Sequence, residues 1–209
     1  MGKPRAKLIL VHRDPVADLD RHLAELASLP KRALSTPTPQ LASPAIAAFV
    51  ELWGSREALQ AAFAAWPSAA RAWLVEETLP ADAARTWPSG VSSPGVRLVS
   101  SVHRRPDLDR SAFAAHWHGP HTEIALAYSV PVWRYGQNVV VEAWGPEDGE
   151  DGFAVLHFRT GEDLVARWAD HPGEAQRGAE DAARFMDRTR GWTVRMTETI
   201  WEGGPAPRA

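Results

Sequence analysis

The sequence predicts an α+β protein made of two consecutive βαββαβ units whose antiparallel sheets close against each other into a barrel. Two observations predict this fold. Strand and helix patterns follow one another in the same order in both halves of the chain, and segments of the second half resemble segments of the first. The length of 209 residues leaves room for two small units with a sizeable core.

The internal repeat is clearest around one predicted strand–helix pair in each half. FVELWGSREALQAAFAAWP (49–67) aligns without gaps with AVLHFRTGEDLVARWADHP (154–172), so that Glu57 pairs with Glu162 and Leu59 with Leu164. The other resembling pairs are LILVHRD (8–14) with LVSSVHRR (98–105), and AWLVEETL (72–79) with RMTETIWE (195–202). Their order is the same in both halves, which favours a duplicated unit.

Each predicted element rests on a local pattern. β-branched and apolar runs predict strands, apolar residues at helical spacing predict helices, and Ser55 is a suitable N-cap. ALSTPTPQ (33–40) is expected at a sheet edge or in a loop, because its two prolines cannot donate backbone hydrogen bonds. The first half thus has strands at 7–13, 45–53 and 72–79 and helices at 16–28 and 55–66; the second has strands at 96–104, 132–142, 153–159 and 192–201 and helices at 109–118 and 161–169.

These elements divide the chain into two ferredoxin-like units. The first is predicted at 1–80 and the second at 96–203, with a Pro-, Ser- and Gly-rich linker at 81–95 and a disordered tail at 204–209. An amphipathic segment at 174–191 has no counterpart in the first half. Two such sheets in one chain can close side by side, which hides their edges.

Composition restricts the partners. The net charge of -3 argues against nucleic acid or an anionic membrane, and no apolar run is long enough to span a bilayer, so a cytoplasmic protein is expected. The absence of cysteine excludes disulfides and thiolate sites. Ten tryptophans suit core packing or a pocket for a small hydrophobic molecule. Both a monomer and a homodimer would fit, the latter through tryptophans such as Trp53 and Trp144.

Two segments of the second half resemble the EthD family, a branch of the dimeric α+β barrel superfamily. They are RRPDLDRSAFAAHWHGPH (104–121) and RYGQN (134–138). The family pattern has Phe, then an aromatic residue four positions on and His four further, followed by an Arg-Tyr pair with Gln and Asn on the next strand. The matching residues here are Phe113, Trp117, His121, Arg134, Tyr135, Gln137 and Asn138.

The resemblance covers about half the chain and has departures. Family members usually follow the histidine with a small residue and proline, whereas this chain continues with Thr122 and Glu123. The first half has no Phe-Trp-His series, and its first helix carries only His22. The resemblance implies the barrel fold and a group of proteins that includes cofactor-free oxygenases, polyketide cyclases and dehydratases.

The stretch HWHGPH (116–121) could be a metal site or an acid–base site. His116 and His118 point about 200° apart on a helix and cannot share a metal. His118 and His121 could meet one turn apart, but Pro120 is expected to interrupt the helix first. The sequence therefore predicts no metal site and no cofactor.

Acid–base chemistry is the alternative. Phe113, Trp117 and His121 are spaced so that a continued or kinked helix turns all three towards the sheet. His121 could then exchange a proton near neutral pH, and Tyr135 could donate to a carbonyl oxygen that gains negative charge. Gln137 shares the face of Tyr135 on a regular strand, whereas Asn138 lies on the opposite face. The structural alternative is that His121 only bonds a backbone carbonyl at a helix break.

Phe113, Trp117, Gln137 and Asn138 are candidate substrate-binding residues, and so are three further histidines. His12 and His103 occupy equivalent strand ends, where each could look into the cavity of its half or pair with solvent or a carboxylate. His157 shares a strand face with Phe153 and Val155, which predicts that it is buried and paired or lines a pocket.

Three functions remain open from the sequence. The leading hypothesis is a cofactor-independent enzyme that acts on a small, hydrophobic, aromatic or polyketide-like substrate by acid–base chemistry, as a cyclase, dehydratase or other lyase. His121 and Tyr135 would be its catalytic residues. The alternatives are a cofactor-free monooxygenase of a degradation pathway and a non-catalytic protein that binds a small molecule.

Overall fold

A computed structural model describes residues 5–38, 46–66, 70–145 and 149–203 of the chain. The strands are β1 (Arg5–His12), β2 (Lys31–Pro37), β3 (Ala48–Trp53), β4 (Arg71–Asp82), β5 (Val96–Val102), β6 (Arg134–Ala143), β7 (Gly152–Phe158) and β8 (Thr193–Glu202). The helices are α1 (Leu19–Glu25), α2 (Arg56–Ala64), α3 (Arg110–His116), α4 (Thr122–Leu126), α5 (Gly161–Ala169) and α6 (Pro172–Ala182), with a π-helical turn (Trp117–His121) between α3 and α4.

The eight strands form one closed barrel in the order β1-β3-β2-β8-β5-β7-β6-β4. All neighbours are antiparallel, so the predicted fold class is confirmed. The first half contributes β4-β1-β3-β2, and the second contributes β8-β5-β7-β6, which is the equivalent order. The halves join where β2 pairs with β8 and where β4 pairs with β6. The topology is thus the same in both halves, while the duplication of the sequence stays a prediction.

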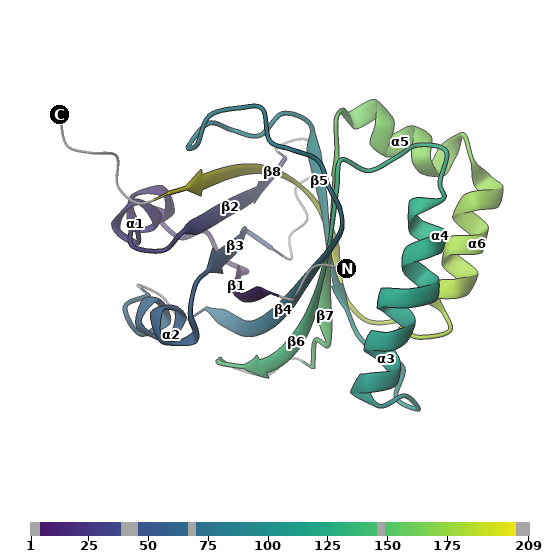
Figure 1. The fold of residues 1–209 in the computed structure, drawn as a ribbon, viewed down its shortest axis with the longest axis horizontal. Coiled ribbons are helices and arrows are strands. Elements are labelled where there is room, and N and C mark those ends of the chain that lie inside the picture. Colours follow the sequence, from purple (N-terminus) through teal and green to yellow (C-terminus); the bar gives the residue numbers. More distant parts are fainter. Residues whose placement is uncertain (1–4, 39–45, 67–69, 146–148, 204–209) are drawn as a thin grey trace.

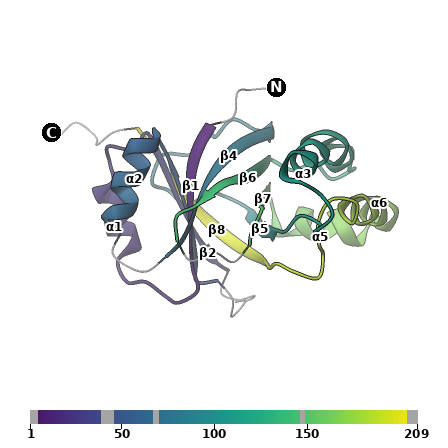
Figure 2. The ribbon, with the colours of Figure 1, turned by 90° about the horizontal axis from the view of Figure 1, so that it is seen from below.

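The helices stand on two opposite sides of the barrel. Figure 1 shows α1 and α2 against the strands of the first half, and α3 to α6 against those of the second. The view from below shows the same separation, with the strands between the two helical layers (Figure 2). Alternate residues of each strand therefore face either the barrel interior or a helical layer.

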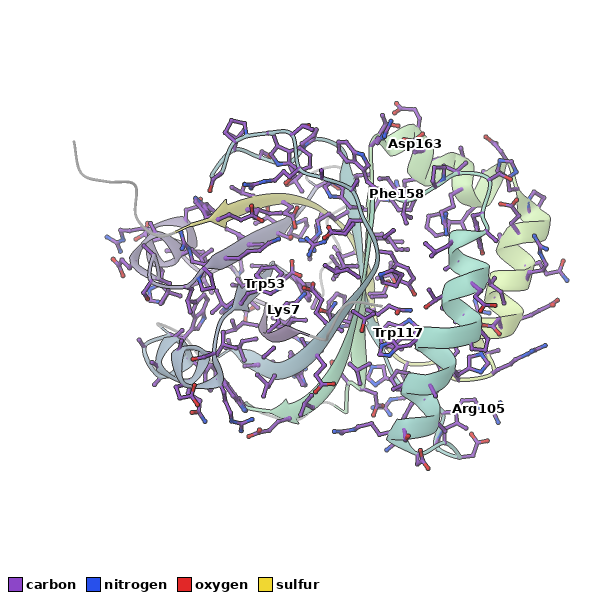
Figure 3. All side chains as sticks on the ribbon, viewed as in Figure 1. Lys7, Trp53, Arg105, Trp117, Phe158 and Asp163 are labelled. Carbon is purple, nitrogen blue, oxygen red and sulfur yellow. The ribbon has the colours of Figure 1, made fainter. Side chains whose placement is uncertain are left out.

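The barrel interior combines an apolar core with buried ion pairs. Apolar residues of all the strands contribute to it, among them Ile9, Phe49 and Phe153. Towards one end, Lys7 Nζ lies 2.8 Å from carboxylate oxygens of both Glu51 and Glu77. Lys7 and Trp53 lie inside the ring of strands in Figure 3. A buried charge is tolerated when it is paired in this way.

The two helical layers are packed differently. In the first half, strand residues such as Leu8 and Leu52 pack with Leu19 and Leu23 of α1 and Leu59 of α2 into one large apolar cluster. In the second half, the buried apolar residues form two smaller clusters, one of Val102, Phe113, Trp117, Val139 and Phe185 and one of Val96, Phe158 and Leu164. The remaining space between the second sheet face and its helices is a cavity.

Three predicted elements need correction. Residues 33–37 do not lie at an edge or in a loop: they belong to β2, which pairs with both β3 and β8, and Pro37 is the last residue of that strand. Residues 39 and 40 of the predicted segment lie outside the described residues. The helix predicted at 16–28 is shorter, and Asp18 before it has a left-handed φ of 59°. β4 runs on to Asp82, into the predicted linker. The predicted tail 204–209 lies outside the described residues.

The helix break expected at Pro120 is also wrong. The chain passes through Pro120 in a π-helical turn and enters α4 directly. A wider turn relieves the contact between a proline ring and the preceding turn, and such turns are common at functional sites. His121 is therefore held on a continuous helical segment.

The tryptophans expected at a dimer surface are not exposed. Trp53 is 6% exposed and lies in the barrel interior, with Lys7 Nζ 4.8 Å from its ring centroid. Trp144 packs on the first apolar cluster, 6.0 Å from the ring of Phe63. Neither residue supplies an argument for a homodimer. None of the helices in the described ranges is both long and apolar enough to cross a membrane.

Candidate functional site

A cavity of about 550 Å³ lies between the strands of the second half and helices α4, α5 and α6. Its wall is mostly apolar and aromatic, and it includes Trp117 and His121 of the π-helical turn and Tyr135 of β6. Figure 3 shows Trp117 between the strands and the helical layer. The other apolar and aromatic lining residues include Leu98, Val102, Ile124, Tyr128, Leu156, Trp168, Phe185 and Met186.

The helix that carries the site follows the predicted spacing. Asp109 caps α3 by accepting a hydrogen bond from the backbone N–H of Ala112, and Phe113 and Trp117 then turn towards the strands. The ring centroids of these two residues are 5.4 Å apart. Phe113 lies beneath the site in the core, whereas Trp117 reaches the cavity wall.

His121 is held by a carboxylate from a helix far away in the sequence. Its Nδ1 lies 2.9 Å from Oδ2 of Asp181, and Nε2 of His116 lies 3.0 Å from Oδ1 of the same residue. Asp181 is 3% exposed and belongs to α6. Burial opposes its ionisation, but the hydrogen bonds with His121 and His116 outweigh burial and lower the pKa of Asp181.

This arrangement defines the protonation of His121. An ionised Asp181 accepts a hydrogen bond, so Nδ1 of His121 carries the proton and Nε2 is the basic nitrogen. Burial lowers the pKa of His121, and the bond with Asp181 only partly offsets this. The ring is therefore neutral at pH 7, with Nε2 making no hydrogen bond within the described part of the chain. A neutral imidazole held at one nitrogen can accept a proton at the other.

Tyr135 presents a hydroxyl whose proton is available. Nε1 of Trp117 donates to its oxygen at 3.0 Å, and Nε2 of Gln137 lies 3.0 Å from the same oxygen. Both groups are donors, so the hydroxyl proton of Tyr135 remains free for another acceptor. Burial raises the pKa of Tyr135 to about 12, which keeps the hydroxyl protonated over the neutral range.

Gln137 links this hydroxyl to the helix above it. Its Nε2 also lies 2.9 Å from the Trp117 carbonyl oxygen and 2.8 Å from Oγ1 of Thr122. Thr122 in turn donates to the Trp117 carbonyl at 2.8 Å. The shared face predicted for Tyr135 and Gln137 is confirmed by their hydrogen bond, and this network fixes the π-helical turn against β6.

Arg167 of α5 is a cation in the cavity wall. Its Nη1 donates to the Val130 carbonyl at 2.5 Å, and its Nη2 donates to the Ala125 carbonyl at 2.6 Å. Its guanidinium carbon lies 3.9 Å from the ring centroid of Tyr128. These contacts hold the charge in one orientation beside the cavity.

Four residues predicted to bind substrate lie elsewhere. Asn138 is on the barrel side of β6 and donates to the Phe153 carbonyl at 2.9 Å, as strand alternation requires. His103 Nδ1 lies 2.8 Å from the Gly149 carbonyl oxygen. His157 faces a separate pocket at one end of the barrel, and its Nε2 lies 2.8 Å from the Pro94 carbonyl oxygen. His12 accepts a hydrogen bond from Nε1 of Trp66 at 3.1 Å.

Sequence reasoning missed Asp181 and Arg167. Asp181 belongs to the segment that has no counterpart in the first half, and nothing in the sequence pairs it with a histidine sixty positions earlier. The sequence gives one indication of Arg167, because it lies one turn after Leu164 on the buried face of α5, where a charged side chain is unusual. Across the described ranges, no group of three or more histidine, aspartate or glutamate residues is arranged to hold a metal ion.

Two solved structures have a similar fold. An anthrone oxidase-like protein matches with a TM-score of 0.65 and 12% identity, over 100% of this chain and 98% of the other. A protein of Lactobacillus acidophilus NCFM that is named as a monooxygenase matches with a TM-score of 0.53 and 8% identity, over 97% of this chain and 98% of the other. No protein-family model and no curated protein sequence matches the chain. The fold of the chain is thus similar to that of these two proteins.

Proposed function

We propose that the chain is an enzyme that removes a proton from carbon or oxygen of a small, flat, apolar substrate and uses only its own side chains to do so. His121 is the general base, through Nε2, and Tyr135 donates to the oxygen that becomes negative. The observation that carries this proposal is the hydrogen bond between His121 and Asp181 at the wall of an apolar cavity. The resemblance to the EthD family belongs to the same proposal.

The chemistry follows from the two protonation states. A neutral imidazole whose other nitrogen donates to a carboxylate is a suitable base near pH 7. A tyrosine that accepts hydrogen bonds from Trp117 and Gln137 can direct its own proton at a developing enolate or phenolate. In a cavity with little polar surface, such a hydrogen bond is stronger than in water.

The carbanion or phenolate so formed has two possible fates. It can expel a leaving group or attack a second carbonyl, which is a lyase or cyclase reaction. It can also react with oxygen. The names of the two similar structures favour the second fate. For a methylene group that is joined to a ketone through aromatic rings, the reaction CH2 + O2 → C=O + H2O balances without a cofactor.

Deuterium exchange measures proton removal separately from the later steps of the reaction. Anthrone is a suitable probe because it is flat and apolar and has an acidic methylene group opposite its carbonyl. Under argon in D2O, we expect the protein to accelerate deuterium entry at this methylene above the rate in buffer. His121→Ala should reduce the acceleration by about 10²- to 10⁴-fold, the usual contribution of a general base. His22→Ala is the matched control, since His22 lies on α1 in the first half.

Oxygen uptake then distinguishes the two fates. Stoichiometric oxygen consumption with formation of anthraquinone supports the oxygenase, and exchange without oxygen consumption supports a lyase or cyclase. Exchange no faster than in buffer, or exchange that persists in His121→Ala, would contradict the proposal. A protein that binds anthrone without exchanging its protons would support the non-catalytic alternative.

A further inference from the structure

Arg167 is a buried cation whose described partners are all neutral. Its side chain is 3% exposed, and its two hydrogen bonds go to the backbone carbonyls of Val130 and Ala125. No carboxylate in the described parts of the chain forms an ion pair with it. A buried charge without a counterion is costly, so a structure that keeps one usually supplies the counterion in another way.

The charged side chains that line the cavity are positive. Its lining includes Arg167 and the exposed Arg188, and among the described residues that line it there is no aspartate or glutamate. Glu174 does not line the cavity. Its carboxylate already accepts hydrogen bonds from the backbone N–H and the hydroxyl of Ser129. Asp181 is already bonded to two histidines.

The guanidinium of Arg167 has unused hydrogen-bond donors. Arginine carries five N–H groups, and the two hydrogen bonds to carbonyls leave three. Stacking on Tyr128 fixes the plane of the group, so its remaining donors need no reorganisation to meet a ligand. A planar, oriented guanidinium is well suited to an oxyanion such as a carboxylate or phenolate.

Arg32 in the first half shows what a purely structural arginine looks like here. It is also buried, and its Nη1 donates to the Leu29 carbonyl at 3.0 Å and lies 3.3 Å from that of Leu26. It lines neither the cavity nor the pocket at the barrel end. Both arginines thus donate hydrogen bonds to backbone carbonyls, and of the two only Arg167 lines the cavity.

We propose that Arg167 selects ligands in which a flat apolar body carries an anionic oxygen, such as an aromatic carboxylate or an acidic phenol. This inference rests on the proposed function, because it names the substrate class of the same cavity. The anionic oxygen binds at Arg167, and the apolar body lies among Trp117, Phe185 and Trp168. Arg188 at the cavity edge adds a positive field that attracts such ligands.

The test compares two probes of nearly equal shape, 9-anthracenecarboxylate and 9-anthracenemethanol, by calorimetric titration at pH 8. We expect the carboxylate to bind at least about tenfold more tightly, as a hydrogen bond to a charged group allows. Arg167→Met should abolish this preference and leave the affinity for the alcohol within about twofold. Arg167→Lys, which keeps the charge, should retain part of the preference.

A matched control and two contradicting outcomes make the result decisive. Arg32→Met removes an equivalent set of backbone contacts and should leave the preference intact. Neither probe carries an acidic C–H group, so binding is measured without proton transfer and failure of the catalytic proposal does not affect this one. Equal affinity of the wild-type protein for both probes would overturn the inference even if Arg167→Met does not fold, and so would a preference that survives in folded Arg167→Met.

Discussion

The two helical layers of the barrel have the same place in the topology and different interiors. In the first half, α1 and α2 lie directly on the strands, and leucines such as Leu23 and Leu59 pack with strand residues into one large buried cluster. In the second half, α4, α5 and α6 leave a cavity of about 550 Å³ above equivalent strands. One layer is packed as a core, and the other contains the cavity of the candidate site.

The difference comes from the polar residues and the additional helix of the second half. Where α1 ends after a few turns, the corresponding segment continues through the π-helical turn (Trp117–His121) into α4. α6, which has no counterpart in the first half, supplies Asp181 to this segment. A helix held by hydrogen bonds at its ends need not collapse onto the sheet, so the space beneath it can stay open.

The largest expected effect is on the filled layer. Leu59 is completely buried, and Leu59→Ala should lower the free energy of unfolding by about 3 kcal/mol through lost burial and the cavity that remains. Leu98 lines the existing cavity and is only partly buried. Leu98→Ala should cost less than half as much. Urea unfolding measures both, and equal losses would contradict the difference in packing.

The next effect concerns Asp181 as a positioning residue. Asp181→Asn should lower the deuterium exchange rate of anthrone by about 10- to 100-fold, the usual effect of losing a partner that orients a reactive histidine. Asp181 also raises the pKa of His121 against the effect of burial. Its removal should therefore shift the acidic limb of the rate profile to lower pH. A purely structural role would lower stability without moving this limb.

His116 provides the control for that experiment. It bonds the same carboxylate as His121, but it is absent from the cavity lining. His116→Gln should change the exchange rate by less than about threefold, because the bond between Asp181 and His121 still orients the base. A loss as large as that of Asp181→Asn would mean that the base is assigned to the wrong histidine.

Sequence patterns predicted most of the fold because each strand and helix has its own local signal. The order of elements, the closure into a barrel and the shared face of Tyr135 and Gln137 all followed from periodicity and strand alternation. The prediction for β2 was wrong because the sequence does not show where in a strand a proline will lie. Pro37 is the last residue of β2, so the hydrogen bonds of this strand with β3 and β8 stay intact.

The site was less predictable because its contacts are long-range. The spacing of Phe113, Trp117 and His121 was recognised, but the predicted helix ended at residue 118, and Asp181, the partner of His121, lies on a helix that the internal repeat does not contain. The π-helical turn depends on side-chain bonds to the Trp117 carbonyl from Thr122 and Gln137, which no local rule anticipates. His12 and His103 occupy equivalent strand ends, but both lie away from the cavity. His12 bonds a tryptophan side chain, and His103 bonds a backbone carbonyl.

A smaller effect is expected when side chains are enlarged. Ala62 lies in the filled layer, so Ala62→Leu should overpack it and lower the free energy of unfolding by about 1 to 3 kcal/mol. Ala179 lines the cavity, and Ala179→Leu should leave stability within about 0.5 kcal/mol, as for substitutions that meet no packed neighbour. The same substitution should weaken binding of 9-anthracenemethanol. Unchanged binding would place the ligand elsewhere.

The smallest expected effect is that of acid on the two layers. Burial lowers the pKa of His12 in the first half and of His121 in the second, so each ring is neutral in the folded protein between its lowered pKa and pH 6.5. The unfolded chain takes up protons in that interval, so each histidine lowers the free energy of unfolding by at most about 1.4 kcal/mol for each unit by which the pH falls. His12→Gln and His121→Gln should each reduce this acid dependence. Only titration of His121 should also slow deuterium exchange, with its midpoint below pH 6.5, and the midpoint should be unchanged in His12→Gln. A midpoint above pH 7 would mean that Asp181 outweighs burial, and His121 would then be mostly a cation rather than a base at neutral pH.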